Sequence, residues 1–187
     1  EEGKRFQVQF DGVYRDAEFW INGFYLGNNK SGYIVVAYDI TDFLRFGADN
    51  VLVVRADATQ YEGGFYEGAG IYRHVWLDAF DDTHIANDGI FAHAAIDGKN
   101  ATLTVETESV NEGDAAAALS TEVVLYDRNG KIAAQSPAQN IRLEVNKSGT
   151  TTHVINFANP RLWNLDDPYL YRIQVNLKKA GKIVDRQ

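Results

Sequence analysis

The residues best suited to chemistry lie between positions 61 and 70. These ten residues contain four Gly, three aromatic side chains and two carboxylates. Aromatic faces stack on sugar rings and carboxylates accept hydrogen bonds from sugar hydroxyls, while Gly lets the backbone approach a ligand closely. The stretch therefore predicts a ligand-facing loop, in which the candidate contact residues are Glu62, Phe65, Tyr66 and Glu67.

A catalytic role for Glu62 and Glu67 is a separate question. Glycosidases use two carboxyl groups held about 5–9 Å apart. Catalytic groups must be positioned to within about 0.5 Å, and a Gly-rich loop does not hold two side chains that rigidly. We therefore predict no catalytic residue here. The alternative to sugar contact is a structural crossover whose tyrosines pack on the neighbouring sheet.

Other reactive sites have no signature in the sequence. The four histidines, at positions 74, 84, 93 and 153, lack a ligand spacing such as His-x-x-x-His, so we expect strand-surface or hydrogen-bonded roles for them. The chain has no Cys, which excludes disulfides and thiolate chemistry. Nucleophile elbows, phosphate-binding Gly loops and dinucleotide fingerprints are missing as well. The sequence predicts no metal site and no cofactor.

Charge and length exclude further classes of function. With a net charge of −8 over 187 residues, the chain repels a phosphate backbone, so no nucleic-acid partner is expected. Its apolar runs fall far short of the ~18 residues of a membrane-spanning helix. A (β/α)₈ barrel needs ~250 residues and does not fit. The compartment stays open, because a cytoplasmic and an exported, periplasmic location are both compatible with this composition.

The elements that must position the loop fall into two halves. Residues 1–80 hold 17 of the 23 aromatic residues and residues 81–187 hold six, which indicates two separate cores. We place the domain boundary at Asp81-Asp82-Thr83, between two strand-like runs. The second half, with about seven strands, fits an immunoglobulin-like sandwich; the first half shows about six, fewer than a complete jelly roll.

Hydrophobic residues alternate with a period of two throughout, which is typical of β-strands. Phe6, Val8 and Phe10 are one example. Asn22-Gly23 and Asn129-Gly130 both predict type I′ hairpin turns. One helical turn is expected over residues 39–47, capped by Asp39 or Thr41. Further strands are expected at residues 33–38, 50–56, 101–108, 141–145, 151–157 and 170–177.

Several motifs, in this order, resemble family 2 glycoside hydrolases, which include β-galactosidases, β-glucuronidases and β-mannosidases. Those similar to the family's sugar-binding domain are Phe10-Asp11-Gly12-Val13, Trp20-Ile21-Asn22-Gly23, Tyr38-Asp39-Ile40-Thr41 and the more specific Gly70-Ile71-Tyr72-Arg73-His74-Val75-Trp76-Leu77. Those similar to the end of its immunoglobulin-like domain are Asn159-Pro160-Arg161-Leu162-Trp163 and Asp167-Pro168-Tyr169-Leu170-Tyr171.

The resemblance implies an all-β chain of two sandwiches. Residues 1–80 would be the later part of a jelly-roll sugar-binding domain, its N-terminal part missing, and residues 81–187 an immunoglobulin-like domain. In such enzymes a (β/α)₈ barrel follows, with the two catalytic glutamates of a retaining mechanism, and both would be absent here. The Gly-rich loop of the family reaches the active site. Trp76 and Trp163 are expected as core anchors or interdomain contacts, and Arg73 in an ion pair.

Three functional hypotheses follow. The leading one is a non-catalytic N-terminal portion of a β-galactosidase-like glycosidase, which would support the barrel, trim its active-site rim and contribute to homo-oligomer contacts. Its partners would be the barrel and, in the parent enzyme, a β-glycoside. The alternative is a stand-alone carbohydrate-binding module that uses the aromatic residues of the first half. The third is a cell-surface adhesion pair that binds protein.

Overall fold

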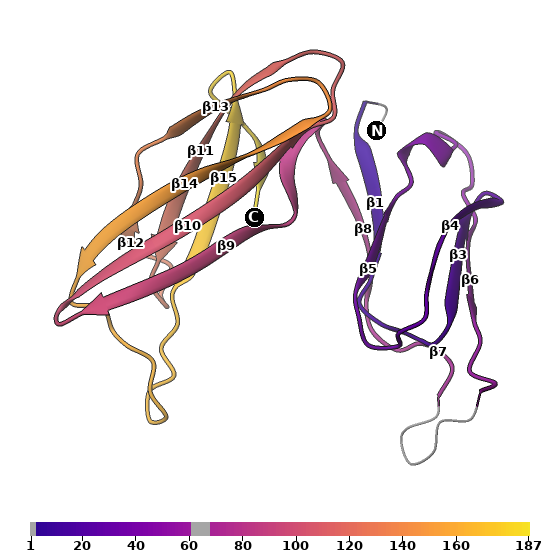
Figure 1. Cartoon of the computed structure of the whole chain (residues 1–187), viewed down its shortest axis with the longest axis horizontal. Helices are drawn as coiled ribbons and strands as arrows, with labels where there is room; N and C mark the ends of the chain where they lie inside the picture. The colour runs from indigo at the N-terminus through magenta and orange to yellow at the C-terminus, as the bar shows by residue number, and fades with distance from the viewer. Residues whose placement is uncertain (1–2, 61–67) are drawn as a thin grey trace. The chain divides into compact units, whose positions relative to one another are not determined.

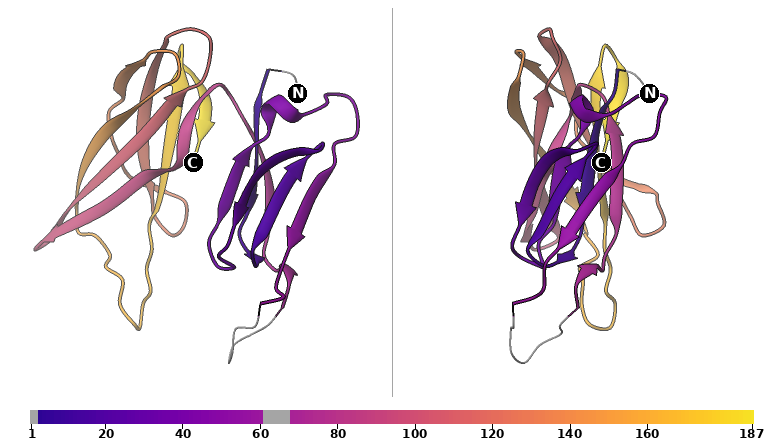
Figure 2. Two further views of the ribbon diagram at one scale, coloured as in Figure 1. Left: turned by 45° about the vertical axis from the view of Figure 1, so that its right-hand side comes forward. Right: turned by 90° about the vertical axis from the view of Figure 1, so that its right-hand side faces the viewer.

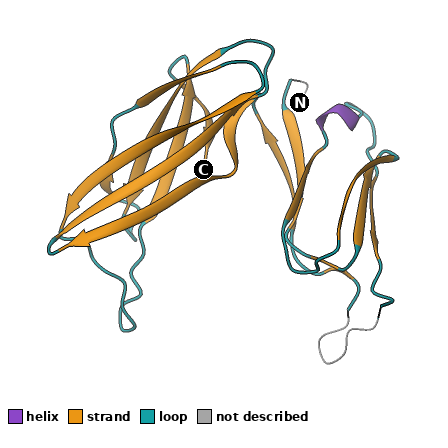
Figure 3. Ribbon diagram, viewed as in Figure 1, coloured by secondary structure: helices purple, strands orange, loops and turns teal. Residues whose placement is uncertain are grey.

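The computed structural model describes residues 3–60 and 68–187 and is built from β-strands, with one short 3₁₀ turn among the described residues (Figure 3). The chain divides into two compact units, unit 1 (Glu1–Phe80) and unit 2 (Asp81–Gln187). Strand and turn thus alternate through both halves, as the period-two pattern predicts. In the described part of the chain, no helix is long and apolar enough to cross a membrane.

Unit 1 is a sandwich of two three-stranded sheets with a short two-stranded ladder (Figures 1 and 2). One sheet has the order β5-β1-β8, the other β4-β3-β6, and β2 pairs with β7. The strands are β1 (Arg5–Phe10), β2 (Val13–Tyr14), β3 (Ala17–Ile21), β4 (Phe24–Asn29), β5 (Val36–Asp39), β6 (Leu52–Ala56), β7 (Gly70–Ile71) and β8 (Val75–Phe80).

The core of unit 1 lies between the two sheets. Val8 and Phe10 of β1 face Phe19 and Ile21 of β3, and all four are buried. The rings of Phe10 and Phe19 approach to 4.7 Å between centroids. The alternation seen in the sequence therefore sets the inward face of each strand, because successive strand residues point to opposite sides.

Asn22-Gly23 forms the predicted hairpin turn between β3 and β4. Both residues have positive φ, 51° and 88°, as a type I′ turn requires. The Asn22 side chain also ties distant segments together: its amide donates to the Phe43 carbonyl at 2.7 Å and its oxygen accepts from the Val51 N–H at 2.9 Å. The nearby helical turn is a 3₁₀ turn (Thr41–Phe43), shorter than expected.

Unit 2 is a larger sandwich. Its sheets have the orders β14-β10-β9 and β12-β11-β15-β16, with β13 also paired to β11. The strands are β9 (Thr83–Asp97), β10 (Asn100–Asn111), β11 (Ala117–Tyr126), β12 (Ile132–Gln135), β13 (Gln139–Leu143), β14 (Lys147–Ala158), β15 (Arg172–Lys179) and β16 (Lys182–Arg186).

A polar network crosses the core of unit 2. His153 of β14 is fully buried, and its Nε2 lies 2.8 Å from Thr121 Oγ1 while its Nδ1 lies 2.7 Å from Ser136 Oγ. Thr121 Oγ1 also lies 2.7 Å from Thr151 Oγ1. Both ring nitrogens are therefore satisfied, as a buried imidazole requires. This confirms the hydrogen-bonded role expected for that histidine.

Unit 2 differs from the sequence prediction at one turn and by one additional strand. Asn129-Gly130 lies in a five-residue loop between Tyr126 and Ile132, in which the Asp127 carboxylate accepts from the N–H groups of Asn129 and Lys131. The second difference is the unexpected strand β16, which Ala180-Gly181 joins to β15 in a two-residue turn with positive φ at both positions, 50° and 77°.

Candidate functional site

The predicted ligand-contact residues Glu62, Phe65, Tyr66 and Glu67 lie outside the described residues. Both flanks of that stretch are held near β2. On one side, the Asp57 N–H donates to the Arg15 carbonyl at 2.9 Å. On the other side, β7 pairs with β2. Residues 58–69 therefore leave and rejoin the sandwich at the end formed by β2 and β7.

Two exposed tyrosines occupy the same end of unit 1. Tyr33 is 66% exposed and Tyr72 is 49% exposed. The Tyr72 hydroxyl donates to the Gly32 carbonyl at 2.7 Å, and the Tyr33 ring meets the buried Tyr14 ring edge-on at 5.8 Å. Position 32 must be Gly because a Cβ there would lie 2.3 Å from the Tyr14 ring. The segment around Gly32 is thus packed closely against the Tyr14 ring, and contacts with this segment and with Tyr14 position the two exposed rings.

Sequence reasoning missed Tyr33, because residues 33–38 were expected to form one strand. The strand begins only at Val36, which leaves Tyr33 in a loop with an open ring face. The Ser31-Gly32 pair just before it is a turn signal that could have separated Tyr33 from the strand. Tyr33 and Tyr72 are the kind of surface on which a sugar ring can stack.

Asp57 is the carboxylate beside this end, and its role is structural. Its Oδ1 accepts from the Thr59 hydroxyl at 2.7 Å, and its Oδ2 pairs with Arg55 at 3.1 Å. The hydrogen bonds from Thr59, with a smaller contribution from Arg55, hold the pKa of Asp57 below its ordinary value. The charged carboxylate thereby fixes the course of the chain after β6.

A second polar cluster lies where β1 meets β8. Asp11 accepts a hydrogen bond from the Trp76 Nε1–H at 3.0 Å and another from the Gln9 amide at 3.0 Å, which together lower the pKa of Asp11. The charge of Arg73 lowers that pKa further. Trp76 is 48% exposed, so its expected role as a core anchor is wrong within unit 1. Its indole lies on the outer face of the sheet, beside His74.

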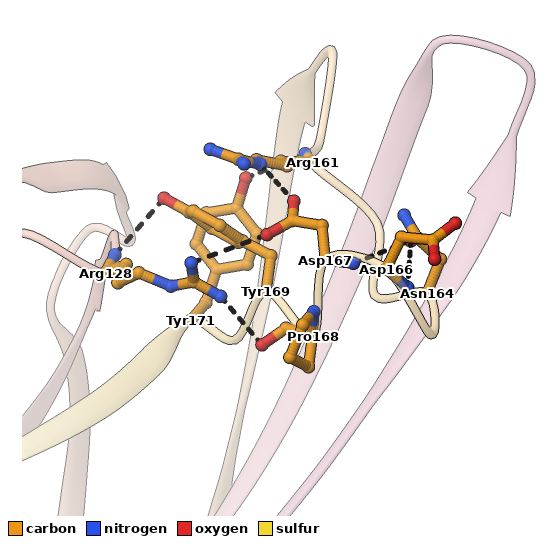
Figure 4. Close-up of polar contacts among 8 residues, drawn as sticks. All are labelled: Arg128, Arg161, Asn164, Asp166, Asp167, Pro168, Tyr169 and Tyr171. Atoms are coloured by element: carbon orange, nitrogen blue, oxygen red, sulfur yellow. Dashed lines mark hydrogen bonds and ion pairs between the residues drawn. The ribbon is translucent and has the colours of Figure 1, made fainter.

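The two motifs that resemble the end of the family's immunoglobulin-like domain lie in one ordered loop of unit 2 (Figure 4). Residues 159–171, which we call the signature loop, contain no helix or strand. The Tyr169 ring lies between two guanidinium groups, with Arg128 4.7 Å and Arg161 4.6 Å from the ring centroid. Asp167 pairs with both arginines, at 3.4 Å and 2.5 Å. Stacking and charge pairing thus replace regular secondary structure here.

Apolar side chains project from the signature loop. Trp163 is 55% exposed and Leu165 is 89% exposed. Trp163 is therefore not a core anchor of unit 2, although the sequence allowed that role. Neither the Asp11 cluster nor the signature loop pairs a nucleophile with a general base. In residues 3–60 and 68–187, no group of three or more His, Asp or Glu is placed to bind a metal.

Comparison with protein families identifies both units. Residues 1–80 match the model described as glycosyl hydrolases family 2, sugar binding domain, and residues 83–187 match the model described as glycosyl hydrolases family 2. Together these matches cover nearly the whole chain. All six family-like motifs lie inside the two matched regions.

Relatives and solved structures agree with that assignment. The chain is 36% identical over 186 residues to beta-galactosidase BoGH2A of Bacteroides ovatus, covering 98% of this chain and 22% of the relative. It is 29% identical over 207 residues to a beta-glucuronidase of Formosa agariphila, covering 99% of this chain and 21% of the relative.

Among solved structures, a glycosyl hydrolase family 2 member from Bacteroides cellulosilyticus superposes with a TM-score of 0.94 at 30% identity, over 100% of this chain and 26% of that one. The chain thus spans about a quarter or less of the length of these relatives. It belongs to glycosyl hydrolases family 2, of which it carries the sugar-binding and immunoglobulin-like domains.

Proposed function

We propose that the chain is the non-catalytic N-terminal portion of a β-galactosidase-like family 2 enzyme. In that enzyme it supports a catalytic barrel that hydrolyses O-glycosidic bonds with retention, and it trims the rim of the active site. The observation that carries the proposal is that two accessory-domain matches fill this chain, while the relatives are about four to five times longer.

The same proposal gives the loop of residues 58–69 its role. The exposed rings of Tyr33 and Tyr72 lie at the end of unit 1 where the described flanks of this loop are held, so this end offers stacking surfaces. The candidate contact residues carried by the loop are Glu62, Phe65, Tyr66 and Glu67. In the parent enzyme these residues contact the β-glycoside at the rim, and the barrel supplies the catalytic glutamates.

An assay of two purified proteins tests this function. The 187-residue chain and the full product of its gene are incubated with chromogenic β-galactosides, β-glucuronides and β-mannosides. We expect turnover by the full product and none by the 187-residue chain. Turnover by the 187-residue chain, after purification from a host lacking these activities, would overturn the proposal.

The second candidate function is a stand-alone carbohydrate-binding module, which the exposed rings of Tyr33 and Tyr72 favour. Calorimetric titration of the 187-residue chain with the same three sugar classes separates it from the first. Millimolar or tighter binding that is lost in Tyr33→Ala supports the module. Absence of heat with all three sugars supports the accessory role.

A further inference from the structure

The chain contains two Asn-Gly pairs, Asn22-Gly23 and Asn129-Gly130. The side-chain amide of an Asn that precedes Gly is chemically labile, because Gly has no Cβ to hinder attack by its own backbone nitrogen on that amide. Both pairs lie in turns between antiparallel strands, the first between β3 and β4 and the second between β11 and β12. They differ in how firmly the Asn side chain is held.

The Asn22 side chain is fixed by three hydrogen bonds. Its amide nitrogen donates to the Phe43 carbonyl at 2.7 Å and to Asn50 Oδ1 at 2.8 Å. Its oxygen accepts from the Val51 N–H at 2.9 Å. Attack on the side-chain carbonyl carbon requires that this side chain rotate toward the next backbone nitrogen. All three bonds must therefore break before Asn22 can react.

The Asn129 side chain lacks such restraints. Among residues 3–60 and 68–187, no hydrogen bond reaches this side chain, and the residue is exposed. The Asn129 N–H donates to the Asp127 carboxylate at 2.9 Å, which holds the backbone but not the amide group. A Cβ added to Gly130 would meet nothing within 4 Å, so the space beside the attacking residue is open. The Gly130 N–H itself is held by one bond, to the Asp127 carbonyl at 3.0 Å.

We propose that Asn129 is a site of spontaneous deamidation and that its conversion weakens the attachment of the signature loop to unit 2. The Gly130 nitrogen attacks Asn129 Cγ and forms a five-membered succinimide ring. Its proton passes through water to the side-chain amine, which leaves as ammonia when the Cγ–Nδ2 bond breaks. Water then opens the ring at one of its two carbonyl carbons, which gives either aspartate or isoaspartate at position 129.

The loop that carries Asn129 is also the anchor of the signature loop (Figure 4). The Arg128 N–H donates to the Tyr169 hydroxyl at 3.2 Å, and the Arg128 guanidinium donates to the Pro168 carbonyl at 2.8 Å. The same guanidinium pairs with Asp167 at 3.4 Å. The position of Arg128 in its turn therefore determines whether these three contacts can form.

Both products of deamidation disturb that turn. Each places a new carboxylate beside Asp127, whose own carboxylate accepts from the N–H groups of Asn129 and Lys131. Like charges at this distance repel each other. Isoaspartate also adds one carbon to the backbone between Arg128 and Gly130, which shifts the register of the turn. We therefore expect conversion to loosen the hold of Arg128 on the signature loop.

Peptide mapping by mass spectrometry tests the reaction. The 187-residue chain is incubated in mildly alkaline buffer, and the replacement of the amide NH₂ by a hydroxyl is followed at both Asn-Gly pairs. We expect Asn129 to convert on the order of 100-fold faster than Asn22, because the Asn22 turn must open first. Equal rates at the two positions, or faster conversion of Asn22, would overturn the proposal.

The same measurement in concentrated urea shows whether the fold causes the difference. With the turns unfolded, the two pairs are expected to convert at comparable rates. A difference that persists unchanged in urea would assign it to the neighbouring sequence and reject the structural argument. Conversion of Asn129 that occurs only in urea would show that the turn protects it, and would overturn the proposal as well.

The variant Asn129→Gln is the matched control for the effect on the signature loop. It keeps an exposed neutral amide but cyclises far more slowly, because its longer side chain must close a six-membered ring. Ageing is expected to lower the melting temperature of unit 2 by about 4 °C or more in the parent chain and to leave Asn129→Gln unchanged. A fully converted chain that melts like the fresh one would overturn the proposal. None of these outcomes bears on the proposed function, which the glycosidase assay tests separately.

Discussion

At the scale of single residues, His153 is a titratable side chain with a structural role in the core of unit 2. The imidazole is fully buried between Thr121 and Ser136, and burial lowers its pKa below the ordinary value of about 6.5. The backbone at Pro137 and the charge of Glu122 act in the opposite direction but do not cancel the effect of burial. The folded chain therefore favours the neutral imidazole more than the unfolded chain does.

The neutral state of His153 predicts a pH dependence. Well above pH ~6.5 the imidazole is neutral in both folded and unfolded chains, so it causes no slope. As the pH falls below that value the unfolded chain binds the proton first, and the free energy of unfolding decreases by up to about 1.4 kcal/mol per pH unit.

Denaturant titrations between pH 5 and 7 measure this slope, with His153→Gln as the comparison. The variant is expected to be less stable but to have a flatter dependence on pH in this range. An identical slope in both proteins would contradict the assignment. The lowered carboxylate pKa of Asp39 is separated from this effect, because its stabilisation is lost only below pH ~4.

At the scale of elements, the signature loop is ordered largely by side-chain contacts, joined by backbone hydrogen bonds such as the one from the Asn164 N–H to the Asp167 carbonyl at 3.1 Å. The Asn164 side-chain oxygen accepts from the N–H groups of Asp166 and Asp167, and the Tyr171 hydroxyl accepts from the Arg161 N–H at 2.9 Å. Together with the Tyr169 stack, these contacts hold thirteen residues without a strand or helix. The exposed Trp163 and Leu165 therefore project from an ordered loop.

The buried Tyr169 and the exposed Trp163 are therefore expected to differ strongly in how much their substitution lowers stability. Tyr169 is 8% exposed, so Tyr169→Ala should destabilise unit 2 by about 2–4 kcal/mol through lost packing and lost contact with both arginines. Trp163→Ala should change stability by less than about 0.5 kcal/mol, since Trp163 is 55% exposed. Thermal unfolding of both variants checks this, and a larger loss for Trp163→Ala would show that the indole is part of the fold.

The sequence predicts elements well where local chemistry decides them. Asn22-Gly23 forms its turn because both residues tolerate positive φ. Ala180-Gly181 adopts a similar turn without that signal, because pairing of β15 with β16 imposes the strained φ of 50° on Ala180. Around Asn129 the Asp127 carboxylate offers a competing set of hydrogen bonds, which sequence spacing does not reveal.

The candidate site is less predictable for a related reason. Along β8, apolar side chains occur on both faces, with Trp76 on one and Val75 and Leu77 on the other. Period-two alternation identifies a strand but, with apolar residues on both faces, does not say which one enters the core. The outward direction of Trp76 becomes clear only from its pairing opposite Gln9.

At the scale of the whole molecule, the two units have separate cores. The buried cluster of unit 1 is centred on residues such as Phe19, that of unit 2 on residues such as Leu177, and the clusters share no member. Domains with their own cores can unfold as separate cooperative units.

Calorimetry of the 187-residue chain is therefore expected to resolve two transitions. Phe19→Ala should lower the free energy of unfolding of unit 1 by about 3–5 kcal/mol and so lower the midpoint temperature of its transition. Leu177→Ala should lower the free energy of unfolding of unit 2 by about 2–5 kcal/mol and lower the midpoint temperature of that transition. Each variant should leave the second transition unchanged. A single transition that both variants lower alike would mean that the two units unfold as one.

The pairing of β1 with β8 has a mechanical consequence. Arg5, where β1 begins, lies opposite Phe80, where β8 ends, so the chain enters and leaves unit 1 at the same end of one antiparallel ladder. Tension along the backbone then separates one pair of facing residues at a time, whereas pulling from opposite ends would load all six pairs of the β1–β8 ladder together. Unit 1 should accordingly yield to a small pulling force, opening like a zipper from the Arg5 and Phe80 rung.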